Sequence, residues 1–239
     1  MQYRTSLVIQ VVSGLIRSGF RRSGRRFIPK YFIIVVLISW LPGQSAAQNR
    51  PMDEASIESF KRRVKDVADN TGTISCDFLQ EKEMSMIKEK IISRGKFYLK
   101  KEKMLRWEYI HPFSYTIVIK NDQISIRDEN KVNHFNIQSN PVFLEINRVI
   151  LGSIQGTLLN DDKNFMATFF ENPTSWVVKL QTLSPRLKES LSEIVIWFDR
   201  KDYTINRLDM NEPAGDFTKL EFSSKKLNKP IADEMFVLH

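Results

Sequence analysis

The 239-residue chain has few of the residues that mark several protein classes: one cysteine, three histidines, nine glycines and nine prolines. One cysteine cannot form an intramolecular disulfide, so a disulfide-stapled scaffold is excluded. The low glycine and proline content excludes collagen-like and low-complexity chains. No apolar run reaches the roughly 20 residues that a membrane-spanning helix needs. The remaining composition, with 42% hydrophobic and 27% charged residues, is that of an ordinary globular protein.

Short motifs of catalysis are also missing. The sequence contains no Gly-x-Ser-x-Gly turn, no glycine-rich phosphate loop and no dinucleotide-binding fingerprint. The histidines, at positions 111, 134 and 239, do not have metal-ligand spacing to one another or to Cys76. Cys76 lies in a strand-like run, so we interpret it as a buried structural thiol. We therefore expect no enzymatic activity, no bound metal and no cofactor.

The net charge of +8 is concentrated at the N-terminus. Seven of the 36 lysines and arginines lie in residues 1–47, which contain no acidic residue. The rest of the chain carries 29 basic against 28 acidic residues. This balance does not favour a polyanion-binding surface, and nucleic acid is not an expected partner.

Residues 1–47 have the pattern of a secretory signal peptide. A basic stretch ends at Lys30 and is followed by an apolar run of 11 residues, 31–41, and by the small residues 45–47. This pattern predicts export with cleavage after Ala47 and a mature chain in the periplasm. An uncleaved anchor is the alternative, but the apolar run is too short to span a bilayer. No cysteine follows the run, so a lipid anchor is not expected.

The mature chain begins with a helical pattern and continues with strand patterns. Apolar residues at helical spacing predict an amphipathic helix from Asp53 to Ala68. A second helix is predicted from Asn140 to Gly152, where a capping Asn and a first-turn Pro precede apolar residues and a terminal glycine. Elsewhere apolar residues recur at every second position, as in antiparallel strands. The predicted strands are 73–80, 97–99, 105–109, 115–119, 124–126, 165–170, 176–180, 194–198, 204–210, 217–222 and 235–238.

About ten or eleven strands are too many for a flat sheet of this size. We therefore predict a mainly β (α+β) fold for residues 48–239. It is a single-domain incomplete antiparallel β-barrel, or strongly curved sheet, covered by short α-helices. Such a sheet encloses either a packed core or a cavity for one apolar ligand, and composition alone does not choose between them.

Three segments occur in a characteristic order along the mature chain: 75–82 (SCDFLQEK), 95–112 (GKFYLKKEKMLRWEYIHP) and 216–222 (DFTKLEF), with Asn228 and Phe236 downstream. The middle segment is the most specific, because it combines a Gly-x-Phe strand, a basic turn and an Arg-Trp-x-Tyr strand. Together these segments resemble the periplasmic outer-membrane lipoprotein carrier family, LolA. The predicted helix from Asn140 to Gly152 is similar to the lid helix of that family.

The resemblance implies a carrier whose apolar concave face takes up the acyl chains of lipoproteins. Such carriers accept lipoproteins from an inner-membrane lipoprotein-releasing ABC transporter and pass them to an outer-membrane acceptor. We expect this chain to act as a monomer. The positions that match the acyl-binding face of the family are Phe78, Phe97, Leu99, Leu105, Trp107 and Tyr109 on strands, and Phe143, Leu144, Ile146 and Val149 on the lid helix.

The basic turn departs from the family pattern. In the family that this chain resembles, the proteobacterial members have an Arg-Pro pair in the basic turn, and the Arg holds the lid by hydrogen bonds. This chain has Lys101-Glu102 at the same place. Lysine offers a point charge rather than a planar fork of donors. We therefore expect a weaker or differently built latch, with Lys101 and Arg106 as its candidate residues.

Two other functions stay open at this stage, because a family resemblance fixes the fold more firmly than the ligand. The chain could bind another apolar cargo, such as a lipid, a pigment or a polyene intermediate. It could also be a sensor domain for mislocalised lipoproteins.

Overall fold

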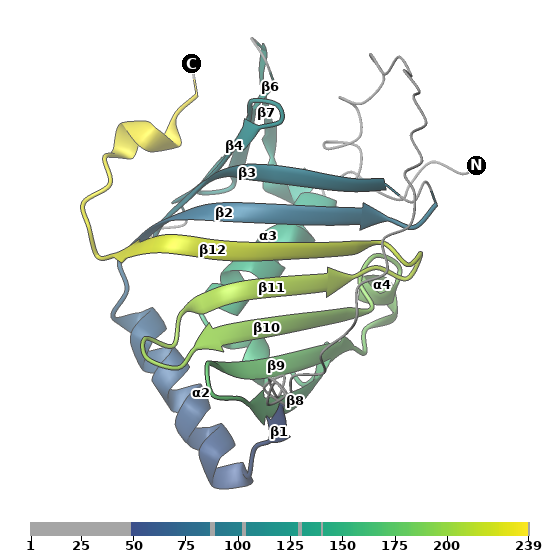
Figure 1. Ribbon diagram of the computed structural model, residues 1–239. Coiled ribbons are helices and arrows are strands. Elements are labelled where there is room, and N and C mark those ends of the chain that lie inside the picture. Colours follow the sequence, from purple (N-terminus) through teal and green to yellow (C-terminus); the bar gives the residue numbers. More distant parts are fainter. Residues whose placement is uncertain (1–48, 87–88, 102–103, 129–130, 140, 239) are drawn as a thin grey trace, which may run out of the picture. The chain divides into compact units, whose positions relative to one another are not determined.

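The computed structural model describes residues 49–86, 89–101, 104–128, 131–139 and 141–238, with the backbone alone for 141–147. Its main feature is one antiparallel sheet with twelve described strands (Figure 1). The strands are β1 (Arg50–Pro51), β2 (Thr73–Met84), β3 (Glu89–Lys100), β4 (Met104–His111), β5 (Tyr115–Lys120), β6 (Gln123–Asp128), β7 (Lys131–Asn136), β8 (Phe165–Glu171), β9 (Ser175–Thr182), β10 (Glu193–Asp199), β11 (Ile205–Asn211) and β12 (Phe217–Leu227).

The strand order in the sheet is β1-β8-β9-β10-β11-β12-β2-β3-β4-β5-β6-β7. Strands β1 and β7 end this order without pairing with each other, so the sheet does not close into a barrel. The helices between and beside the strands are short: α2 (Glu54–Asp69), α3 (Pro141–Ile154), α4 (Pro185–Lys188), η1 (Ile137–Ser139), η2 (Thr157–Asn160) and η3 (Asp233–Phe236). The predicted fold class, an incomplete antiparallel barrel with a few short helices, is confirmed.

Helix α2 forms where the sequence predicts it. The Asp53 carboxylate caps the helix by accepting a hydrogen bond of 2.7 Å from the Ser56 N–H. The apolar stripe then buries Phe60 and Val64 against the sheet. The Phe60 ring packs at 5.2 Å from the Phe198 ring of β10 and at 5.7 Å from the Trp176 ring of β9. These contacts fix α2 over the β8–β11 side of the sheet.

The sheet has an inner face, which we define as the face that carries Phe78, Phe97 and Trp107. The strand register places these side chains together, because Cys76 pairs with Phe97 and Phe97 pairs with Trp107. Helix α3 lies behind the central strands in the view of Figure 1. The inner face is therefore the one that α2 and α3 cover.

The opposite, outer face is covered in part by the C-terminal segment. Phe236 and Leu238 are buried in a cluster with Met104 of β4 and Val118 of β5. The Arg106 guanidinium donates to the carbonyl oxygen of Met235 at 3.1 Å. This packing explains why residues 104 and 118 are buried although they lie on the face away from the helices.

Two predicted elements differ from the structure, and strand β7 is an element that the sequence did not predict. The segment 235–238 is not a strand, since η3 occupies Asp233–Phe236 and alternation there reflects packing on the outer face. Helix α3 continues past Gly152 to Ile154, and the glycine with left-handed backbone is Gly156, at φ +69°. Strand β7 was not predicted because most of its side chains are exposed, so it lacks apolar alternation.

Candidate functional site

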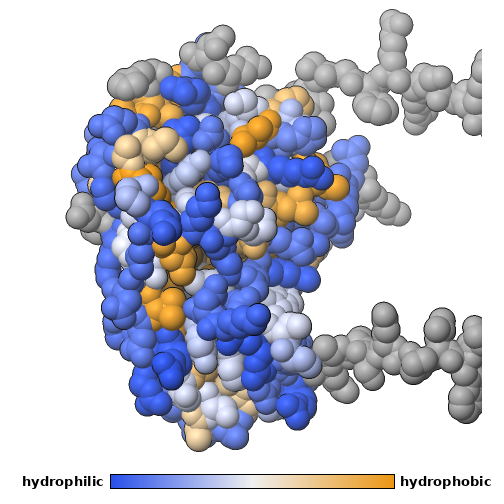
Figure 2. All heavy atoms as spheres, turned by 60° about the vertical axis from the view of Figure 1, so that its left-hand side comes forward, coloured by the Kyte–Doolittle hydropathy of each residue, from blue (hydrophilic) through white to orange (hydrophobic). Residues whose placement is uncertain are grey.

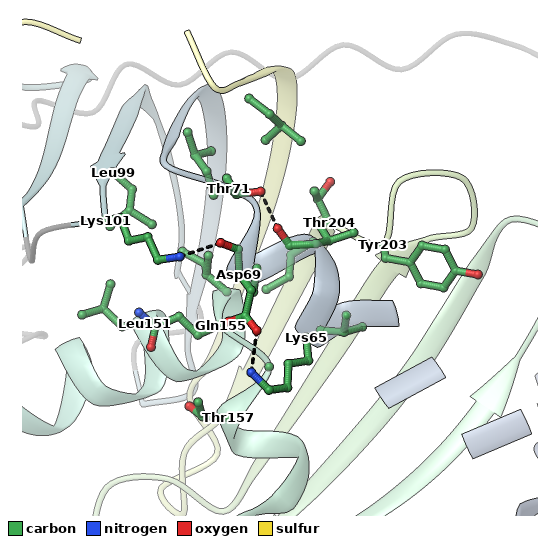
Figure 3. Close-up of a pocket in the computed structure, with 18 of the residues that line it drawn as sticks. Lys65, Asp69, Thr71, Leu99, Lys101, Leu151, Gln155, Thr157, Tyr203 and Thr204 are labelled. Atoms are coloured by element: carbon green, nitrogen blue, oxygen red, sulfur yellow. Dashed lines mark hydrogen bonds and ion pairs between the residues drawn. The ribbon is translucent and has the colours of Figure 1, made fainter. Parts of the chain in front are cut away.

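A cavity of about 690 Å³ lies on the inner face, between the sheet and the ends of two helices. Strands β2, β3, β11 and β12 provide one wall, α2 provides a second, and the C-terminal end of α3 with the following loop provides a third. In the close-up of Figure 3, Leu99 comes from the sheet and Leu151 from α3. A volume of this size is within the range of small-molecule binding sites, about 300–1,000 Å³.

The floor of the cavity is apolar. Because β-strand side chains alternate between faces, every second residue of the central strands contributes to this floor. Its members are Ile74 and Cys76 of β2, Phe97 and Leu99 of β3, Ile205 of β11, and Phe222 and Leu227 of β12, with Val64, Val67 and Ala68 of α2 and Leu151 and Ile154 of α3 opposite them. Burial raises the pKa of the Cys76 thiol to about 12, so this side chain is a neutral part of the wall. The prediction of a buried thiol is confirmed.

An aromatic cluster supports the floor from the side. The Trp107 ring lies 5.2 Å from Phe97 and 5.1 Å from Phe78, and Phe78 lies 5.1 Å from Tyr109. The Tyr109 hydroxyl donates to the Gln80 amide oxygen at 2.9 Å. Edge-to-face and offset ring contacts of this kind stabilise a structure by about 0.5–1.5 kcal/mol per pair beyond the burial of their area.

Charged residues surround the apolar floor. The Lys65 ammonium lies 2.6 Å from the Asp69 carboxylate, and the Lys101 ammonium donates to the Asp69 carbonyl oxygen at 2.6 Å (Figure 3). The hydrogen bond from Lys65 lowers the pKa of Asp69. In Figure 2, which brings the left-hand side of Figure 1 forward, hydrophilic residues predominate on the surface and hydrophobic ones show between them. The cavity thus combines an apolar interior with a polar entrance.

A scan against protein-family profiles finds one match, which covers residues 69–239 and is described as "Outer membrane lipoprotein carrier protein LolA". The chain belongs to the LolA family. The description of this family supports a role in binding lipid or lipoprotein. No curated protein sequence matches the chain.

Solved structures with a similar arrangement have low sequence identity to this LolA-family chain. A LolA superfamily protein of Nitrosomonas europaea has 8% identity and a TM-score of 0.39, over 76% of this chain and 97% of the other. The lipoprotein LppX of Mycobacterium tuberculosis has 12% identity and a TM-score of 0.46, over 75% of this chain and 99% of the other. The MucA/MucB complex of Pseudomonas aeruginosa has 10% identity and a TM-score of 0.47, over 77% of this chain and 61% of the other.

The strand residues predicted for acyl binding all lie on the inner face of this LolA-family sheet. Phe97 and Leu99 line the cavity, whereas Phe78, Trp107 and Tyr109 belong to the supporting aromatic cluster. Leu105 pairs with Leu99 and Ile119 and is only 4% exposed. It therefore sits in packed core beside the cavity rather than at its mouth.

On α3 the structure describes some of the predicted residues and not others. Val149 is buried. The side chains of Phe143, Leu144 and Ile146 lie outside the described residues, so their role stays a prediction. Two α3 residues line the cavity: Leu151, just before the predicted end of the helix at Gly152, and Ile154, just beyond it.

The two candidate latch residues have partners other than α3. Lys101 joins the β3–β4 turn to the end of α2, through its side chain on Asp69 and its N–H on the Gly72 carbonyl oxygen at 2.9 Å. Arg106 points to the outer face, where it donates to Glu108 at 3.0 Å and to Met235. A latch on α3 made by either residue stays a prediction.

Several residues that line the cavity were not predicted from the sequence as binding residues. The α2 contributions follow from its apolar stripe, and Ile74 follows from strand alternation, so both could have been found. Lys225 could not, because it enters the cavity through an irregularity of β12 that the sequence pattern does not announce.

Two features are not found among the described residues: a cluster of metal ligands and a membrane-spanning helix. Within them, no three His, Cys, Asp or Glu side chains are grouped as metal ligands. In the same part of the chain, no helix has both the length and the apolar character to cross a membrane.

Trp107 offers a test of the aromatic cluster. Its indole N–H is buried and has no hydrogen-bond partner among the described residues. Replacing Trp107 by Phe removes this unsatisfied donor and keeps an aromatic ring, so we expect the free energy of unfolding to change by less than about 1 kcal/mol. Trp107→Ala should cost about 3–5 kcal/mol, because it leaves a cavity in the cluster. Urea unfolding measures both, and equal losses would mean that an aromatic ring at this position does not stabilise the cluster.

Proposed function

We propose that this protein is a periplasmic carrier that shields the acyl chains of lipoproteins in the inner-face cavity and carries them from the inner to the outer membrane. The observation that carries this proposal is the apolar cavity of about 690 Å³ under the ends of α2 and α3. An open sheet with a helix-covered inner face is suited to taking up a ligand, because its edges are not joined into a closed barrel.

The physical need for such a carrier follows from the cost of exposing lipid. Each acyl methylene in water costs about 0.8 kcal/mol, so a multiply acylated protein cannot cross an aqueous compartment unshielded. The packed rings of Phe78, Phe97 and Trp107 support the sheet side of the cavity, and α2 and α3 face it from the other side. A ligand held between the sheet and these helices can be released when a helix moves.

The proposal extends to location and partners. The predicted signal peptide, which lies outside the described residues, would deliver the chain to the periplasm. There it would receive lipoproteins from an inner-membrane lipoprotein-releasing ABC transporter and pass them to an outer-membrane acceptor. The family description, which names an outer-membrane lipoprotein carrier, supports this direction of transport.

Native mass spectrometry of the full chain purified from its own periplasm tests this function. We expect an added mass that matches an acylated polypeptide and that is lost after incubation with acceptor membranes. A bound pigment, polyene or free lipid, with no acylated polypeptide in any preparation, would contradict lipoprotein carriage and favour another apolar cargo.

A further inference from the structure

Strand β12 contains a bulge that changes which side chains face the cavity. Its register with β2 is regular up to the pair Ser223–Asp77, and the next pair is Lys226–Ser75. Three steps along β12 therefore match two steps along β2, and Ser224 has a left-handed backbone with φ +54°. A one-residue insertion of this kind redirects the following side chains.

The bulge turns a lysine inward. Without it, strict alternation from Phe222 would place Ser224 and Lys226 on the inner face. With it, Lys225 and Leu227 follow Phe222 along the cavity wall, and all three line the cavity. Lys226 is left exposed on the other side. Lys225 is thereby the charged residue that the sheet itself contributes to the apolar floor.

The nearest partners of the Lys225 ammonium are neutral oxygen atoms. It donates to the Thr204 hydroxyl and to the Asn206 amide oxygen, both at 2.5 Å, and to the Ile205 carbonyl oxygen at 3.5 Å. Its ion pair with Asp202 is long, at 3.8 Å, and that carboxylate also accepts hydrogen bonds from Thr204. The Lys225 side chain is 15% exposed, and burial lowers its pKa. The carboxylate of Asp199 also attracts this ammonium. Its nearest partners are nonetheless neutral oxygen atoms, and an ammonium held in this way can still pair with an anion.

The lining of the whole cavity also carries an excess of positive charge. Its lining includes five basic residues and two acidic ones: Lys61, Arg62, Lys65, Lys101 and Lys225 against Glu58 and Asp69. Asp69 already pairs with Lys65. An excess of positive charge around an apolar floor favours a ligand that is apolar at one end and anionic at the other.

We propose that Lys225 is the polar anchor of the cavity and binds the anionic group of an amphiphilic cargo, a carboxylate or a phosphate joined to acyl chains that lie on Phe97, Leu99 and Leu227. This inference rests on the proposed function, since it takes the cavity to be the cargo site. The shared chemistry has two sources: an acidic residue next to the acylated end of a lipoprotein, or the phosphate of a phospholipid.

Three ligands with the same chain length separate the contributions of charge and chain. Palmitate carries a carboxylate, hexadecyl phosphate carries a phosphate, and methyl palmitate carries no charge. Displacement of a fluorescent fatty acid from the full chain gives their dissociation constants. We expect the wild type to bind at least one anion about tenfold tighter than the ester, which corresponds to about 1.4 kcal/mol. The anion with the larger preference identifies the source.

Lys225→Met keeps an unbranched side chain and removes the charge. It should abolish the preference for the anion and leave the affinity for methyl palmitate within about twofold, because the apolar floor is unchanged. Lys226→Met, at the neighbouring exposed lysine, is the matched control and should keep the preference. A purely structural role of Lys225 would instead weaken all three ligands together, and that result overturns the anchor.

Failure of the inference and failure of the function give different results. If the wild type binds none of the ligands, the cavity is not an acyl site and the proposed function fails. If the wild type binds ester and anions equally, or Lys225→Met keeps the preference, only the anchor fails. If Lys225→Met does not fold, amide NMR spectra of the wild type test the anchor instead. Palmitate or hexadecyl phosphate should shift the amide resonances of Lys225 and Thr204, and methyl palmitate should not. Identical shifts with all three ligands overturn the anchor.

Discussion

Replacing Gly95 by alanine should destabilise the protein by about 3 kcal/mol or more and prevent accumulation of folded chain. Gly95 lies in β3 at the register shift with β4, under the Phe78 ring. A Cβ atom there would stand 1.9 Å from the carbonyl oxygen of Glu108 and 2.7 Å from Phe78. The first of these atoms is backbone, so the clash cannot be relieved by a side-chain rotation, and β3 and β4 would have to separate.

Gly72→Ala is the matched control for this substitution. A Cβ at Gly72 would meet its nearest neighbour, the Asn228 amide oxygen, at 3.6 Å, which is an ordinary contact. We expect a change of less than about 1 kcal/mol there. Thermal and urea unfolding of the two variants beside the wild type measure the difference. A folded, fully stable Gly95→Ala protein would show that the β3–β4 register is wrong.

The second large effect concerns binding. Changing Ile74 to Glu should weaken binding of a neutral acyl ester by about 100-fold or more, which corresponds to about 2.7 kcal/mol. Ile74 is half-buried, lines the cavity, and pairs with Leu99 on one side and Leu227 on the other. A carboxylate against hydrocarbon chains loses its water, at a cost of several kcal/mol. In the empty cavity it stays hydrated, so the fold should survive.

Ser75→Glu adds the same charge one residue further along β2. Ser75 pairs with Tyr98 and Lys226, on the outer face, where a carboxylate remains in water. This control should bind the ester like the wild type. Ligand displacement and urea unfolding of both variants separate loss of binding from loss of fold. If Ile74→Glu binds the ester normally, acyl chains do not occupy this cavity.

Much of the fold could be predicted from the sequence because local signals agree with the tertiary structure. Helix α2 has both a cap at Asp53 and a continuous apolar stripe, and the two define it without reference to the rest of the chain. The central strands alternate because one side is covered by helices. The outer-face segment around Phe236 was misassigned because its apolar spacing reflects contacts with β4 and β5, which a local pattern cannot reveal.

The candidate site was predicted as a face and not as a cavity. Alternation placed Phe97 and Leu99 correctly on the inner face, where they line the cavity. It also predicted Leu105 as a cavity residue, but Leu105 pairs with Ile119 and lies beside the cavity. Which inner-face residues border empty space depends on where α2 and α3 end over the sheet. The bulge at Ser224 is a second reason why the lining could not be predicted from the sequence. One extra residue moves each side chain that follows it in the strand to the opposite face.

The place of β12 in the sheet has a consequence for the order of folding. This strand lies between β2 and β11, so it joins the first hairpin of the sheet, β2 and β3, to the strands β8–β11. Pairing such as Lys82 with Thr218 closes a very long loop, and contacts of this kind form slowly. The two halves of the sheet can be united only when β12 is present.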